Sequence, residues 1–195
     1  MSGEERCAPY VAALRREFPG LRFVQKRADG FSRVVDRALR IVTIGGQSEY
    51  LTRYVTTMGQ TIYFPDGWDA RDDLERYCVL RHEAVHLRQF RRYGRLGTAL
   101  LYLVPLLPLG LAWGRARLEW EAYAETLRAT AEVRGVAALD APELRAHIVR
   151  QFTGPAYGWM WPFPRVVSGW YDIVVADLRS AELSVAGVEP RRESV

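Results

Sequence analysis

The chain has 195 residues and a mass of 22.3 kDa, which is enough for one sizeable core and short for two independent domains. Apolar residues make up 49% and charged residues 26%, as is ordinary for a globular protein. The net charge is +4, but the basic residues are interleaved with acidic ones and form no long basic block, so no nucleic-acid partner is expected. Two cysteines cannot make a disulfide framework, and the first residues do not resemble a signal peptide, so we expect a cytoplasmic protein.

The N-terminal third predicts one helix followed by strands. Apolar residues at helical spacing indicate a helix over 4–18, which a Pro-Gly pair ends. A short strand is expected over 21–24, and 32–44 is rich in β-branched residues. The segments 50–57 and 60–64 flank a Met-Gly pair, which indicates a hairpin.

The next helix carries the most informative motif of the chain. It is predicted to begin with Asp69 as the N-cap and to end at Gly94. Within it, His82, Glu83 and His86 form a His-Glu-x-x-His pattern. Side chains four residues apart share a helix face, so both imidazoles can bind one metal ion. Glu83 can then reach a metal-bound water, which is the arrangement of a zinc hydrolase.

An apolar segment, 97–113, follows this helix and contains no charged residue. Pro105, Pro108 and Gly110 interrupt it, and its length is at the lower limit for a membrane span. Three interpretations stay open: a buried loop or short helix pair, a loop that enters one leaflet between flanking arginines, and a full span. A full span would put the two halves of the metal site on opposite sides of the membrane.

A second strong helix is predicted over 115–134, ended by a glycine. A catalytic zinc usually has three protein ligands and one open position. The chain has three histidines in all, so the third ligand must be His147 or a carboxylate. On the second helix the carboxylate candidates are Glu119, Glu121 and Glu125.

The combination resembles the gluzincin metallopeptidases, in which His-Glu-x-x-His is followed on a later helix by a ligand glutamate in Glu-x-x-Ala. Glu119 and Ala122 fit that pattern, and Glu119 lies 33 positions after His86 (119 − 86). The small Ala122 would allow two metal-binding helices to approach closely. The resemblance covers mainly 60–130 and implies Zn²⁺ held by His82, His86 and Glu119. It also implies Glu83 as general base and a protein or peptide substrate.

In zincins the strand before the metal helix often aligns an extended peptide by backbone pairing, so the hairpin is expected at a sheet edge. Gluzincins often supply a His or Tyr from a downstream segment to stabilise the oxyanion, and here His147 and Tyr157 are the candidates. His147 belongs to a helix predicted from Asp140, as N-cap, to about Phe152.

The remaining C-terminal part is predicted to be aromatic and helical. The segment 153–164 is dense in aromatic residues, Pro and Gly, and its Trp and Phe side chains are expected to pack rather than to form a substrate pocket. A last helix is predicted over 166–183, and the end of the chain reads as a tail.

Together these features predict an α+β, zincin-like fold: a small antiparallel or mixed sheet with an edge hairpin on the metal-binding helices, and a mostly helical C-terminal half. We expect one domain over 1–195, divided into 1–68 (helix and β-rich part), 69–135 (metal-site helices and apolar insertion), 136–188 (helical and aromatic part) and 189–195 (tail). The expected function is a zinc metallopeptidase, with peripheral membrane contact through 97–113 left open. The alternative is a non-catalytic, metal-stabilised or membrane-surface interaction protein.

Overall fold

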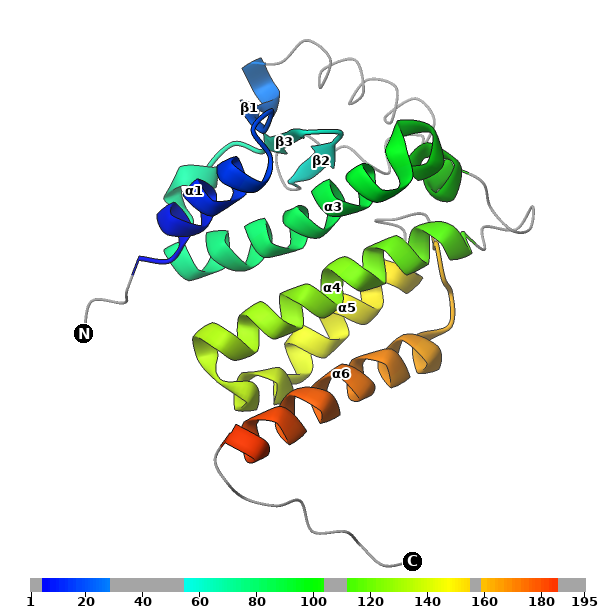
Figure 1. Ribbon diagram of the computed structural model, residues 1–195. Coiled ribbons are helices and arrows are strands. Elements are labelled where there is room, and N and C mark those ends of the chain that lie inside the picture. Colours follow the sequence, from blue (N-terminus) through cyan, green and yellow to red (C-terminus); the bar gives the residue numbers. More distant parts are fainter. Residues whose placement is uncertain (1–4, 29–54, 104–111, 155–158, 186–195) are drawn as a thin grey trace, which may run out of the picture.

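The computed structural model describes residues 5–28, 55–103, 112–154 and 159–185, and it shows an α+β protein that is mostly helical (Figure 1). Within those ranges there are five α-helices and one three-stranded mixed sheet. The β-rich region predicted at 32–44, Tyr157 and the C-terminal tail lie outside the described residues.

The first helix, α1 (Cys7–Glu17), confirms the predicted N-terminal helix. Leu14 and Phe18 on its inner side are almost completely buried. The backbone N–H of Phe18 donates to the Leu14 carbonyl at 2.8 Å, and the helix ends there, just before the Pro-Gly pair. The predicted strand follows as β1 (Arg22–Gln25), with a 3₁₀ turn, η1 (Lys26–Ala28), after it.

The predicted hairpin is confirmed as β2 (Thr56–Met58) and β3 (Thr61–Phe64), which pair antiparallel around Gly59 in the left-handed region, φ 62°. The strand order is β1-β3-β2, and β1 runs parallel to β3. The strand directly before the metal-motif helix, β3, is therefore central and has neighbours on both sides. Among the described strands, β2 is the edge strand nearest to α3. A peptide could therefore lie beside β2, and not beside β3.

The motif helix, α3 (Asp73–Leu103), begins later than predicted. The N-cap assignment of Asp69 is wrong, because a separate 3₁₀ turn, η2 (Trp68–Ala70), contains that residue. Asp72 takes the capping role instead: its Oδ2 accepts hydrogen bonds from the backbone N–H groups two and three residues further on, at 3.1 and 3.3 Å.

The helix was predicted to end at Gly94, and only its first, straight part ends there. Gly94 adopts φ 68° and ψ 174°, which L-residues rarely do, and α3 kinks there and then continues as a second helical segment. The start of the apolar segment 97–113 is thus helical rather than a loop, and residues 104–111 lie outside the described part. Leu96 and Leu100 are exposed on the second segment. Among the helices of the described ranges, none has the length and apolar character needed to cross a membrane.

The C-terminal helices largely follow the predicted pattern. Helix α4 (Trp113–Arg134) ends at Gly135, which has φ 81°, as expected of a glycine stop. Then come η3 (Val136–Asp140), α5 (Pro142–Thr153) and α6 (Pro164–Val185).

The N-cap assignment of Asp140 is wrong. Asp140 closes η3, and the N-cap of α5 is Ala141, which supplies no side-chain hydrogen bond. Pro142 begins the helix, because its fixed φ suits the first turn and its missing N–H is not needed there.

Two apolar cores lie on either side of the pair α3 and α4. One joins α1, the sheet and the inner face of α3, with Leu14, Ile62 and Leu80 buried in it. The other joins α4, η3, α5 and α6, with Leu127 and Phe152 at its centre. Helices α3 and α4 run side by side between the two cores (Figure 1) and form the most extensive helix–helix contact of the described chain.

Candidate metal centre

Three potential ligands meet in the seam between α3 and α4. The Nε2 atoms of His82 and His86, on successive turns of α3, are 3.3 Å apart. Oε2 of Glu119 on α4 is 3.9 Å from the first and 3.8 Å from the second. One ligand atom from each of the three residues lies within 4.8 Å of the others. Tetrahedral zinc with ligands at about 2.0–2.2 Å separates them by roughly 3.3–3.6 Å, so the group needs only a small contraction to fit zinc.

The three residues are withdrawn from solvent. His86 and Glu119 are buried, and His82 keeps 13% of its side-chain surface exposed. Burial, and then the nearby charge of His86, lower the pKa of His82 well below its ordinary value. His82 is therefore neutral at physiological pH, which is the state in which imidazole binds a metal.

A hydrogen-bond chain through Gln89 sets the tautomer of His86. The Gln89 amide Nε2 donates to the Leu118 carbonyl at 2.9 Å and to Glu121 Oε2 at 3.0 Å. Its Oε1 must then face His86, where it accepts from Nδ1–H at 2.9 Å. With the proton on Nδ1, the Nε2 lone pair of His86 points to the group of ligands.

Thr126 sets the tautomer of His82. Its hydroxyl donates to the Ala122 carbonyl one turn back at 3.2 Å, so the oxygen offers a lone pair to His82 Nδ1 at 3.1 Å. Nδ1 therefore carries the proton, and Nε2 again offers a lone pair. Two Nε2 lone pairs thus face each other beside the Glu119 carboxylate, and a cation bound between them would interact favourably with all three groups.

Two further residues shape the pocket around His82. The Tyr123 ring packs edge-on against the imidazole, with centroids 4.8 Å apart. Thr126, one turn along α4 from Ala122, provides the hydrogen bond to His82 Nδ1. Ala122 is completely buried, in agreement with a small residue at the close approach of the two helices.

The other two carboxylates of the second helix are engaged elsewhere. Glu121 accepts from Gln89 and lies 3.6 Å from Arg117. Glu125 forms an ion pair with Arg81 at 2.5 Å. Neither belongs to the group of close ligand atoms, which among the described residues singles out Glu119.

Glu83 is buried next to the site without joining it. Its carboxylate oxygens are outside the group of close ligand atoms, yet they interact electrostatically with His86 and Glu119. The hydroxyl of Thr57, on the edge strand β2, donates to Glu83 Oε2 at 2.6 Å. Burial is the main cause that raises the pKa of Glu83 above its ordinary value. A carboxyl group with a raised pKa is better suited to accepting a proton than an ordinary surface glutamate.

The two proposed oxyanion donors are not brought to the site by the described residues. His147 is exposed on α5, where its Nε2 lies 3.4 Å from the amide nitrogen of Gln151. Among the described residues, His147 is not part of the group of close ligand atoms. Tyr157 falls outside the described residues.

Sequence reasoning did not assign a role to Gln89, Thr126 or Thr57. The spacing of the first two does give a signal. Gln89 is three residues after His86 and lies on the same face of α3, and Thr126 is seven residues after Glu119 and lies on the same face of α4. Thr57 carries none, because its contact with Glu83 depends on how the hairpin packs on α3.

Comparisons with protein-family models, with curated proteins and with solved structures find no match for this chain. The resemblance to gluzincins therefore stays a prediction from the motifs.

Proposed function

We propose that the chain is a zinc-dependent hydrolase of peptide bonds, with His82, His86 and Glu119 as the metal ligands. The observation that carries the proposal is the convergence of two imidazole Nε2 lone pairs and one carboxylate oxygen in a buried seam. Imidazole and carboxylate ligands suit zinc, and three of them leave a fourth position for water or substrate.

Zinc held there would lower the pKa of a coordinated water towards 7 and polarise a substrate carbonyl. The chain's own contribution is Glu83, which accepts the proton of the attacking water and returns it to the leaving amine. Thr57 keeps the Glu83 carboxylate in place through its 2.6 Å hydrogen bond. Because Thr57 belongs to the edge strand β2, a peptide paired along that strand would lie close to the base.

The non-catalytic alternative explains fewer of the contacts. A structural zinc site is usually closed by four protein ligands and needs no general base. Here the group has three ligands among the described residues, and Glu83 is buried beside it at a cost in desolvation. A buried carboxyl with a raised pKa beside a group of potential metal ligands is a candidate catalytic group.

The test combines zinc content with peptide cleavage. Wild type should hold near-stoichiometric zinc and cleave an unstructured protein substrate. Glu83→Gln should keep the zinc and lose about 10²–10⁴-fold in rate, which is the usual contribution of a general base. Glu119→Ala should lose both zinc and activity.

Glu125→Gln is the matched control, since Glu125 lies on the same helix but outside the ligand group. It should keep zinc and activity. Wild type without zinc would overturn the metal site, and full activity in Glu83→Gln would overturn the assignment of the base. Zinc without any cleavage in wild type would support the non-catalytic alternative.

A further inference from the structure

One end of the molecule exposes large apolar side chains that a folded protein normally buries. Trp113 at the start of α4, Phe163 just before α6 and Val166 in its first turn are all exposed. Trp159 is 56% exposed, and Ile173 on α6 is 62% exposed. Single exposed apolar residues are ordinary, but a group of them marks an interaction surface.

Two of these side chains, Trp113 and Phe163, belong to one connected aromatic layer, since both rings contact that of Trp161. The ring of Trp113 is 5.0 Å from that of Trp161 and 6.1 Å from that of Trp170, centroid to centroid. Trp170 in turn lies 5.4 Å from Trp120. We call Trp113, Trp120, Trp161, Trp170 and Ile173 the indole surface.

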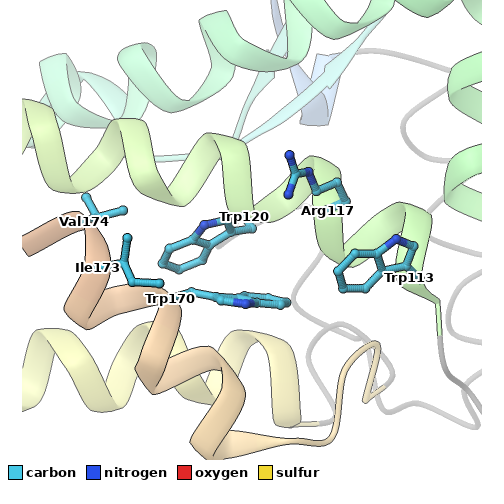
Figure 2. Close-up of a pocket in the computed structure, with 6 residues that line it drawn as sticks. All are labelled: Trp113, Arg117, Trp120, Trp170, Ile173 and Val174. Carbon is cyan, nitrogen blue, oxygen red and sulfur yellow. The ribbon is translucent and has the colours of Figure 1, made fainter. Parts of the chain in front are cut away.

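The indole surface is hollowed. A cavity of about 220 Å³ opens between α4 and α6 (Figure 2), lined by Trp113, Arg117, Trp120, Trp170, Ile173 and Val174. Its wall is apolar except for the Arg117 guanidinium, whose side chain is 63% exposed and lies 3.6 Å from Glu121. Such a recess suits a hydrocarbon group with an anionic group above it.

Basic side chains outnumber acidic ones near the indole surface, although Glu121 lies beside Arg117, and Asp172 and Asp177 are exposed near Ile173. Residues 84–118 contain six arginines, of which Arg88 and Arg91 pair with Glu17 on α1, and residues 144–171 contain three, of which Arg145 pairs with Asp172. The end of α3 and the starts of α4 and α6, which these ranges include, lie at the same end of the molecule (Figure 1). Exposed arginines at the starts of α4 and α6 include Arg117, which lines the cavity, and Arg165.

We infer that this end of the molecule binds an anionic phospholipid surface. Indole rings, with an apolar body and a polar N–H, favour the boundary between headgroups and acyl chains. Arginines beside them would contact lipid phosphates, as in other interfacial proteins that combine an apolar face with basic residues. Ile173 and the recess would take up acyl-chain carbon. The inference does not depend on the proposed hydrolase function.

Charge argues against a second copy of the chain as the occupant. A two-fold symmetric contact brings the same patch of each copy together, so arginines would face arginines. Like charges across an interface oppose association, whereas an anionic membrane surface attracts them.

The experiment uses the full chain and two kinds of vesicle: phosphatidylcholine alone, and equal parts of phosphatidylcholine and phosphatidylglycerol. The protein should co-sediment with the anionic vesicles and not with the neutral ones. Binding should weaken as salt is added, because exposed charges are screened. Tryptophan fluorescence should shift to shorter wavelength on binding, since indoles leave water.

Matched variants separate this surface from general charge and folding effects. Arg117→Gln with Arg165→Gln should weaken binding about 25-fold, taking about 5-fold for each surface arginine. Arg128→Gln with Arg179→Gln changes the far ends of the same two helices and should have little effect. Ile173→Ser should reduce binding, whereas Leu183→Ser, also exposed but near the end of α6, should not.

Far-ultraviolet circular dichroism and thermal unfolding of each variant show whether it folds. No binding of wild type to anionic vesicles at low salt would overturn the inference, as would equal losses in both arginine pairs. Self-association of wild type that Ile173→Ser abolishes, without vesicle binding, would assign the surface to a second copy instead.

Discussion

The two long faces of α4 are built from opposite kinds of residue. The face toward α3 carries Glu119 and Thr126, opposite the buried His86 and Gln89. The face toward α5 and α6 is apolar, with Leu127 at its centre. Burying apolar surface stabilises a fold, whereas burying carboxylates and imidazoles costs free energy unless they are satisfied. The α3–α4 seam is therefore not arranged for the stability of the chain alone.

A metal ion would change that balance, because it offsets the desolvation of its ligands and ties the two cores together. Proteins depart from the general rules of burial mostly at functional sites. The seam is therefore expected to depend on metal, whereas the α4–α6 core is not.

The largest effect expected is that of zinc on the metal-free protein. At a free zinc concentration one thousand times its dissociation constant, the free energy of unfolding should rise by about 4 kcal/mol. Denaturant unfolding with and without zinc measures the gain. Glu119→Gln should abolish it, because it replaces a charged ligand by a neutral amide. If zinc still raises the free energy of unfolding of Glu119→Gln, Glu119 is not a ligand of a metal site between α3 and α4.

Leu127→Ala tests the apolar face. Leu127 is completely buried, and truncation should lower the free energy of unfolding by about 3 kcal/mol, within the usual range for a buried leucine. The stabilisation by zinc should stay the same, because the ligands lie on the other face. Urea unfolding of the metal-free and zinc-bound forms checks both values.

A smaller effect is expected at Thr126. Thr126→Val removes the acceptor of His82 Nδ1–H at nearly constant volume, and zinc affinity should fall about 10–100-fold. Thr130→Val is the control, because the Thr130 hydroxyl makes the same kind of bond to a carbonyl one turn back, that of Thr126, on the same helix. Competition with a chelator measures both affinities, and equal losses in the two variants would contradict the role of Thr126.

The smallest effect is expected from a surface ion pair on α1 and α3. Arg88 donates to Glu17 at 2.7 and 3.0 Å, and Arg91 does so at 3.2 Å. The hydrogen bond from Arg88 is the main cause that lowers the pKa of Glu17 in the folded state. Because the pKa of Glu17 is lower in the folded state, the ion pair stabilises the fold at pH values above the pKa of the unfolded state, near 4.5. This stabilisation is lost as the pH falls through the pKa of the folded state.

Because Glu17 and its partners are partly exposed, Glu17→Gln should cost less than about 1 kcal/mol at pH 7. The difference between the variant and wild type should vanish at low pH. Denaturant unfolding over a pH series measures it, and a difference that persists in acid would show that packing, and not charge, is responsible.

Local pattern was sufficient to predict most of the helices and the hairpin. Periodicity located α1, α4 and α6 to within a few residues, and Gly135 ended its helix as expected, because these signals act over one or two turns. Caps were predicted less well. Asp69 and Asp140 are good N-cap residues by type, but each is in or at the end of a 3₁₀ turn that takes the chain away from the helix start.

For the site, the sequence by itself determined that His82 and His86 share one face of a helix and that Glu83 stands beside them. Spacing along a helix is a property of the backbone and does not depend on what packs against it. Helix spacing left Glu119, Glu121 and Glu125 open, and only the resemblance pointed to Glu119. The tertiary structure brings Glu119 to the histidines, because the side of α4 that meets α3 depends on how both helices pack against their cores. The same packing selected Gln89 and Thr126 as hydrogen-bond partners of the histidines.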